Sequence, residues 1–463
     1  MRAAISSRFN PVTREHSCVL LVALVAVTLI WPTSGWAVTI FGSDFVSPGK
    51  IWDPGFSLFG EELSPRLDID GLARVQILDD QLQNQHNDLV VPQVDLQTNL
   101  QLTATQRVFA LIRPLEYGDR EPTFYKFGND HGWTGRFDPT PQALFFEGAP
   151  LNWLNPNDRL PLDMTLSVGR IPLFLHNGLW FNNFFDGFSI AKNNIQLGNL
   201  SNFNVLYFLT LGETQPGLTL TTPSRREAEK KVMGVDFNFN WSDYFVEGSW
   251  ALSYANGEVP GAKMNLNRNF WAVSITRSFS YDAGVSFRAM GNTANSTTSD
   301  GELLVLEAQR GVFGTQLYSN IFGATRSWIV PSVQGSALNR EGILFTFDRL
   351  VATPQLSPRA SGTVGGTIGD IINPGGHLTL TPEFGWLIDN ESTNNDQVGL
   401  ALQMQSDISK LLMPGNTLTN LKGRGLLYGS EVRLTILGVR NQNTAQAGDR
   451  FDYGTNLELI YEF

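Results

Sequence analysis

The segment Tyr244-Phe-Val-Glu-Gly-Ser-Trp-Ala-Leu-Ser-Tyr254 decides the fold class of this chain. Every second residue is apolar, aromatic or glycine and lies on one face: Tyr244, Val246, Gly248, Trp250, Leu252 and Tyr254. Such period-two alternation is typical of a β-strand with one apolar face. At about 3.3 Å per residue the strand measures roughly 33 Å. Tilted by about 40°, it covers roughly 25 Å, the height of the apolar band of a membrane β-barrel, with a tyrosine at each edge.

The same alternation recurs along the chain and is clearest in 93–102, 162–168 and 233–240. A soluble β-sandwich would also alternate, so strand length, aromatic placement and the end of the chain must separate the two classes. The last alternating segment carries on one face Leu457, Leu459, Tyr461 and Phe463. A terminal aromatic in this place resembles the signal that the outer-membrane assembly machinery reads. We therefore predict an all-β fold, a transmembrane antiparallel up-and-down β-barrel of about 16–18 strands.

Composition agrees with a lipid-facing β-surface in a Gram-negative outer membrane, where lipid and lipopolysaccharide would surround the protein. Aromatic residues make up 11% of the chain, and charged residues only 17%, against about 25% in typical soluble domains. The formal net charge of −11 argues against nucleic acid as a partner.

The beginning of the sequence has the pattern of a secretory signal peptide. Arg2, Arg8 and Arg14 precede an apolar run over 19–31, and small residues follow it up to Ala37. We expect cleavage after Ala37; an uncleaved anchor helix is the alternative. The single cysteine, Cys18, lies before the apolar run, so the mature chain would have no thiol for disulfides, catalysis or metal binding.

Three regions follow from this pattern: a signal peptide over 1–37, a periplasmic or lumen segment over 38–66, and the barrel over 67–463. The middle region shows no strand rhythm and contains Pro48, Pro54 and Pro65. The strands predicted in the barrel, with boundary errors of about two to four residues, are 67–78, 93–103, 106–113, 142–149, 162–169, 184–191, 203–211, 231–240, 244–254, 269–278, 283–290, 302–309, 314–321, 341–349, 377–387, 397–405, 425–437 and 453–463.

Connections between these strands should alternate between short periplasmic turns and longer external loops. The short turns are predicted at 104–105, 241–243, 279–282 and 310–313. Two long connections, 351–376 and 406–424, also fall on the periplasmic side. Either they are true periplasmic loops, or the strand count is wrong there.

Catalytic and metal-binding motifs are missing from the sequence. Neither G-x-S-x-G nor H-E-x-x-H occurs. The mature histidines, His86, His131, His176 and His377, are not at metal-ligand spacing and are expected in loops or at interfaces. The acidic, amide-rich segment 389–396 lacks the glycine spacing of a calcium loop and reads as an external loop. We therefore predict no enzyme, no cofactor and no metal; an outer-membrane enzyme would instead need a strand histidine within reach of a serine or carboxylate.

Charged residues inside strands are expected in the lumen, because Arg or Lys at the membrane midplane costs about 2–4 kcal/mol. They are Asp68, Asp70, Arg74, Asp95, Arg107, Arg113, Asp163, Asp236, Glu247, Arg288, Glu431 and Arg433. The candidates for contact with a solute at the lumen or constriction are Arg74, Arg107, Arg113, Arg170, Arg288, Arg433, Asp95 and Glu247. The alternative for each arginine is a structural pair with a neighbouring acid.

The run Leu166-Ser-Val-Gly-Arg-Ile-Pro-Leu-Phe-Leu-His-Asn-Gly-Leu-Trp-Phe-Asn-Asn-Phe-Phe-Asp-Gly-Phe188 resembles barrels of the alginate-export and related porin families. The resemblance covers roughly 140–190 and the C-terminus. It implies an eighteen-stranded export channel, with Arg170 in the constriction and 406–424 as an occluding periplasmic loop. We predict a channel for passive diffusion or export of small hydrophilic or saccharide-type solutes. The alternative is a closed barrel that acts as an adhesin or membrane scaffold.

Overall fold

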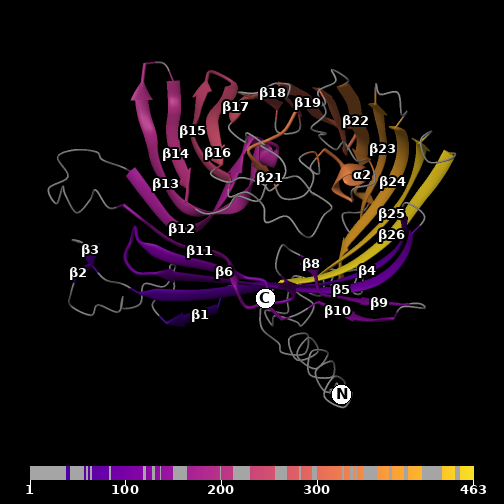
Figure 1. Ribbon diagram of the computed structural model, residues 1–463, viewed down its shortest axis with the longest axis horizontal. Coiled ribbons are helices and arrows are strands. Elements are labelled where there is room, and N and C mark those ends of the chain that lie inside the picture. Colours follow the sequence, from indigo (N-terminus) through magenta and orange to yellow (C-terminus); the bar gives the residue numbers. More distant parts are fainter. Residues whose placement is uncertain are drawn as a thin grey trace, which may run out of the picture.

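The structure is a computed structural model (Figure 1). It describes residues 38–41, 57–58, 61–62, 65–82, 85–117, 121–127, 131–135, 137–149, 164–198, 200–211, 230–255, 268–280, 283–294, 300–325, 328–333, 338, 341–347, 350, 362–374, 378–389, 395–408, 430–443 and 449–462. Asp163 and His377 lie outside these residues, as does most of the segment 389–396.

Eighteen antiparallel strands form one closed ring. In ring order they are β4 (Arg66–Leu82), β5 (Gln85–Gln101), β6 (Arg107–Ile112), β11 (Pro141–Gly148), β12 (Met164–Leu175), β13 (Phe181–Leu197), β14 (Leu200–Thr210), β15 (Lys230–Trp241), β16 (Tyr244–Ala255), β17 (Arg268–Ser280), β18 (Ala283–Ala294), β19 (Gly301–Val312), β20 (Thr315–Thr325), β22 (Gly362–Ile371), β23 (Thr379–Asp389), β24 (Asn395–Asp407), β25 (Ser430–Asn443) and β26 (Asp449–Glu462). β26 pairs with β4 and closes the ring, so the predicted fold class is confirmed.

Short elements extend this ring. β1 (Val38–Phe41) pairs with the first residues of β4, where β26 has already ended. β9 (Phe124–Lys126) pairs with β5 and with β10 (Gly132–Thr134). Two further ribbons are β2 (Ser57–Leu58) with β3 (Glu61–Glu62), and β7 (Glu116–Tyr117) with β8 (Glu121–Pro122). Among the described residues, no helix is both long and apolar enough to cross a membrane.

Each strand turns alternate residues outward and inward, as the sequence predicts. In β19, Leu304 and Leu306 are 49% and 43% exposed, whereas the alternate residues Leu303 and Val305 are 0% and 1% exposed. The outward set on other strands is also apolar and includes Trp250, Val273, Phe287, Ile321, Phe384 and Leu400. A closed ring with such an outer surface is the architecture of an outer-membrane β-barrel.

The short turns lie together at one end of the ring. Links at 242–243, 281–282 and 313–314 join neighbouring strands, and 102–106 joins β5 to β6, which confirms all four predicted turns. Aromatic side chains flank the first three links: Trp241, Tyr244, Phe279 and Phe313. The Arg277 guanidinium lies 5.1 Å from the Tyr244 ring centre and 4.9 Å from that of Phe279. Short turns and an aromatic girdle mark the periplasmic end of an outer-membrane barrel.

The predicted strand 341–349 is wrong. Its residues contain the short helix α2 (Ile343–Thr346), which lies inside the ring. The strand that the prediction missed is β22, which falls within the supposed loop 351–376. β22 escaped notice because four of its ten residues are glycine, which weakens the alternation. A Cβ on Gly365 would lie 2.7 Å from the Phe322 ring, and one on Gly369 would lie 2.2 Å from the Tyr318 ring.

The second long connection, 406–424, starts at the end of β24 and leads toward β25 on the periplasmic side. Most of it lies outside the described residues, so its role as an occluding loop stays a prediction.

The two faces of β19 generate a stability test. Leu306→Arg places a guanidinium against lipid near the middle of the strand, and we expect a loss of about 2–4 kcal/mol in the free energy of unfolding. The control Gln309→Arg changes an exposed residue on the inward face and should cost less than about 1 kcal/mol. Chemical unfolding in lipid vesicles measures both. Equal losses would show that the two faces are wrongly assigned.

Candidate functional site

Two described elements of the connection between β20 and β22, the strand Ser332–Val333 and the helix α2, lie inside the ring (Figure 1). We call the connection's described residues 328–333, 338, 341–347 and 350 the plug segment. Within it, β21 (Ser332–Val333) pairs in parallel with the first residues of β13, and α2 contacts β23 and β24. A long external connection, not a periplasmic one, therefore occupies the lumen among the described residues.

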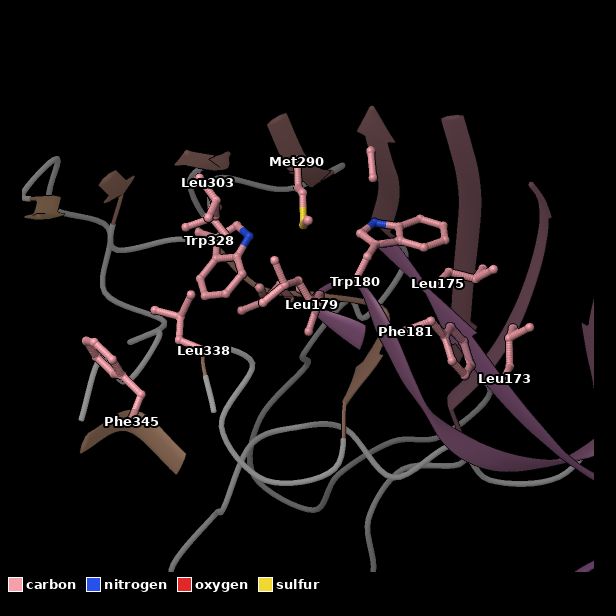
Figure 2. Packing of buried hydrophobic residues seen from close by; sticks show 14 of the residues in the cluster. Leu173, Leu175, Leu179, Trp180, Phe181, Met290, Leu303, Trp328, Leu338 and Phe345 are labelled. Atoms are coloured by element: carbon pink, nitrogen blue, oxygen red, sulfur yellow. The ribbon is translucent and has the colours of Figure 1, made fainter. Parts of the chain in front are cut away.

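An apolar cluster holds the plug segment to the wall. Figure 2 shows Trp328, Leu338 and Phe345 of the plug beside wall residues that include Met290 and Leu303. All five are at most 2% exposed. Phe345 also meets the wall residue Phe322 edge to face, with ring centres 5.4 Å apart. Burial of apolar surface stabilises by about 25 cal/mol per Å², so this cluster favours docking of the plug segment on the wall.

A buried carboxylate fixes the position of α2. Glu383 on β23 accepts hydrogen bonds from the backbone N–H of Ile343 at 2.8 Å and of Leu344 at 2.9 Å. The Tyr318 hydroxyl donates to the same carboxylate at 2.5 Å. Gly342 precedes the helix at φ 141°, and a Cβ there would lie 2.5 Å from Glu383 Oε2. Glycine is required because the carboxylate needs this space and the backbone is left-handed.

The tip of the β12–β13 connection is also attached to the inner face of the wall, at β16 and β17. His176 and Asn177 adopt positive φ values of 52° and 59°, in the short 3₁₀ turn η2 (His176–Gly178). The His176 ring lies 2.6 Å from Ser274 Oγ through Nδ1 and 2.9 Å from Ser249 Oγ through Nε2. Its backbone N–H donates to Glu247 Oε1 at 2.8 Å. Burial, with a smaller effect of Arg288, lowers the pKa of His176 to about 3, so the imidazole is neutral at physiological pH.

The histidine cluster bears on the enzyme and metal alternatives. His176 lies in a connection rather than on a strand, but it is within reach of serines and of Glu247. It is fully buried and serines occupy both ring nitrogens, so no substrate reaches it in this conformation. Ligand atoms of His176, Asp236 and Glu247 lie within 4.8 Å of one another, as do those of Asp79, His86 and Asp88 near the β4–β5 link. These are the two groups among the described residues that could hold a metal ion.

Arg288 is the cation in a group of side chains that we call the buried layer: His176, Ser249, Glu247, Arg288 and Glu307. Its Nε and Nη2 donate to Glu307 Oε2 at 2.9 and 2.5 Å, and Asn177 Nδ2 donates to Glu307 Oε1 at 3.2 Å. Arg288 also acts electrostatically on Glu247 and Glu341. The Arg288 guanidinium thus hydrogen-bonds to Glu307 and attracts the negative charges of Glu247 and Glu341.

The opposite wall, formed by β25, β26, β4, β5 and β6, has a polar inner face. Arg113 lies 3.2 Å from Asp95, and Arg433 lies 2.9 Å from Glu431. Arg74 donates to Gln93, which in turn donates to Asp95 at 2.9 Å. Among the described residues, no carboxylate lies within ion-pair distance of Arg74. This wall offers charges of both signs to a solute, and Arg74 is its least compensated cation.

Seven of the eight candidate residues identified from sequence lie on inward-facing positions: Arg74, Arg107, Arg113, Arg288, Arg433, Asp95 and Glu247. Arg288 and Glu247 belong to the buried layer, and Arg107 pairs with Glu147 at 2.8 Å.

Arg170 departs from its expected place in the constriction. It shares its face of β12 with Val168 and Phe174, which are 46% and 47% exposed, and therefore points outward. There it lies opposite Asp186 of β13, at 3.9 Å. The phase of the alternation predicts this, because Arg170 has the same parity as the apolar residues of its strand.

Sequence reasoning missed the plug segment, which carries Glu341, and the wall acids Glu307 and Glu383 that lie near it. Glu307, Glu341 and Glu383 stand in no recognisable motif. Part of the plug segment falls within the predicted strand 341–349, where Ile343, Phe345 and Phe347 alternate with other residues.

Comparisons with solved structures identify similar barrels. OccAB2 of Acinetobacter baumannii matches with a TM-score of 0.55 at 10% identity, over 86% of this chain and 98% of that one. OccK2 (OpdF) of Pseudomonas aeruginosa in complex with glucuronate gives a TM-score of 0.51 at 10% identity, with the same coverage. A BenF-like porin from Pseudomonas fluorescens Pf-5 gives 0.52 at 9%, again with that coverage.

No protein-family model and no curated protein matches the chain. At these identities the structural likeness shows the fold, which is that of outer-membrane porins. The resemblance to the alginate-export family stays a prediction.

Loss of the central cation tests the buried layer. Arg288→Met leaves Glu307 without its guanidinium, and we expect a loss of about 3–5 kcal/mol in the free energy of unfolding. Arg107→Met is the matched control, because the Arg107–Glu147 pair is exposed and should contribute less than about 1 kcal/mol. Equilibrium unfolding in detergent compares the two. Similar losses for both variants would contradict the central role of Arg288.

Proposed function

We propose that this chain is an outer-membrane channel through which small hydrophilic solutes diffuse. The observation that carries the proposal is the uneven lumen. The plug segment packs against one wall, and the other wall keeps an inner face of charged and amide side chains. Such a face lowers the cost of passage for a hydrated solute, whereas the plug narrows the path and sets the size limit.

The path would follow the wall formed by β25, β26, β4, β5 and β6. Along it, Arg113, Arg433 and Arg66 pair with neighbouring acids and hold their side chains against the wall. Arg74 keeps its positive charge available to the solute. Paired charges of both signs favour neutral or weakly charged polar molecules, and Arg74 adds an attraction for a carboxylate.

Saccharide-type solutes are the first class to test. The structurally similar OccK2 was determined in complex with glucuronate, an acidic sugar whose size and charge would suit the polar wall. We propose the same broad class for this chain: sugars and small carboxylates that move by diffusion in either direction, without a chemical step or a cofactor.

Export and assembly complete the proposal. Residues 1–37 would be removed as a signal peptide, and 38–66 would stay at the periplasmic mouth. The assembly machinery would read the last strand up to Phe463, and lipopolysaccharide would cover the outer leaflet around the barrel.

The apolar docking of the plug segment favours a second candidate. A barrel whose lumen stayed closed would serve as an adhesin or as the membrane scaffold of a complex. The two candidates differ in one measurable property, ion conduction.

Single-channel recording in a planar bilayer under a salt gradient tests the channel. We expect discrete stable conductance steps from the refolded protein. Arg74→Gln should shift the reversal potential toward cation preference, because it removes a lumen cation. Arg277→Gln removes an outward-facing cation at the periplasmic girdle and should leave the potential unchanged.

Vesicle swelling in glucuronate and in a disaccharide then reports which solutes pass. A folded barrel that is silent in the bilayer and impermeable in vesicles would exclude the diffusion channel and favour the scaffold.

A further inference from the structure

Glu341 is a buried carboxylate for which the described residues supply no hydrogen-bond donor. It belongs to the plug segment, is 0% exposed, and neither Oε1 nor Oε2 has a hydrogen-bond partner among the described residues. The backbone around it is well held. Its carbonyl accepts hydrogen bonds from Asn320 Nδ2 at 3.1 Å and from the Thr367 hydroxyl, and its N–H donates to the Leu338 carbonyl at 3.0 Å. The side chain is therefore kept in place by its neighbours and not by bonds of its own.

The charged groups around Glu341 make its ionised form unfavourable. Glu307 on β19 repels a negative charge there, whereas Arg288 on β18 attracts it. The Arg288 guanidinium is already bonded to Glu307. On β23, the Glu383 carboxylate accepts hydrogen bonds from the backbone N–H groups at the start of α2 and from the Tyr318 hydroxyl of β20. None of these described groups donates a hydrogen bond to Glu341.

A buried carboxylate without donors is stable only in its neutral form. Burial, and then repulsion by Glu307, raise the pKa of Glu341 to about 8 when the plug segment is docked. When the plug segment is undocked, the Glu341 carboxyl would be hydrated and its pKa would lie near its ordinary value of 4.5. Docking and proton binding are therefore linked.

We propose that docking of the plug segment requires protonation of Glu341, so that the lumen is narrow in acid and wider in alkali. The inference rests on the proposed channel function only for its conductance readout. The apolar cluster holds the plug segment, and Glu341 makes this attraction depend on pH.

The direction follows from the two protonation states. Below about pH 4.5 the carboxyl is neutral in both the docked and the undocked form, so docking is at full strength. As pH rises toward 8, the undocked form loses its proton first, and the ratio of docked to undocked molecules falls by about tenfold per pH unit. Docking is weakest above pH 8.

The first experiment records channel conductance between pH 5 and pH 9. We expect conductance or open probability to rise across this range in the unaltered chain. Glu341→Gln keeps a neutral side chain of the same shape at every pH, so it should stay in the acid-like state throughout. Glu302→Gln removes an exposed outward carboxylate from β19 and should behave as the unaltered chain.

A second readout does not depend on conduction. Leu338 of the plug segment is 0% exposed, and Cys18 is the only cysteine, so Leu338→Cys combined with Cys18→Ser gives one buried thiol. Its reaction with N-ethylmaleimide, followed by mass, reports undocking. Thiol reactivity itself rises with pH, so each rate is divided by that of the same variant carrying Glu341→Gln. We expect this ratio to increase with pH.

The outcomes separate the two proposals. A channel that conducts with the same pH dependence in Glu341→Gln, or a thiol ratio that stays flat, overturns the role of Glu341. A barrel that is silent at every pH but whose thiol ratio rises overturns the channel and supports the linked plug. A silent barrel with a flat ratio overturns both.

Discussion

Closure of eighteen strands into one ring is the constraint on which the rest of the structure depends. The diameter of a barrel grows with its number of strands, and beyond about eight the inward side chains no longer meet across the lumen. An eighteen-stranded ring must therefore fill its interior with water or with chain. In this protein the plug segment covers the inner face of one wall, and the described residues of the other wall present charged and amide side chains on their inner face.

Filling a barrel with chain creates a problem of charge. The plug segment brings Glu341 to a wall that already holds Glu247, Glu307 and Glu383, with Arg288 as the cation among them. Each carboxylate removed from water needs a donor or a proton. Glu307 receives Arg288 and Asn177, and Glu383 receives the backbone of α2. Among the residues that the structure describes, Glu341 receives neither, so the shortage of donors falls on the residue that moves with the plug segment.

Period-two alternation predicted most of the ring because lipid on one side and polar contacts on the other impose it. Where those conditions fail, the prediction fails. β22 has glycines at 365 and 369 on its inward face because the rings of Phe322 and Tyr318 fill the space there. The family resemblance places Arg170 in the constriction, whereas its parity places it on the outer face with Val168. The buried layer could not be predicted, because His176, Ser249 and Arg288 meet only after the ring has closed.

The sequence does contain a signal for the plug segment, in strands whose two faces are both apolar. Residues 303–306 read Leu-Leu-Val-Leu, so the inner face of β19 is as apolar here as its lipid-facing side. Further along the strand the inner face becomes polar at Glu307. A water-filled lumen would not select such a face. An apolar inward stretch that ends halfway along a strand therefore predicts a chain segment docked inside the barrel, and the change to polar residues marks the depth to which that segment reaches.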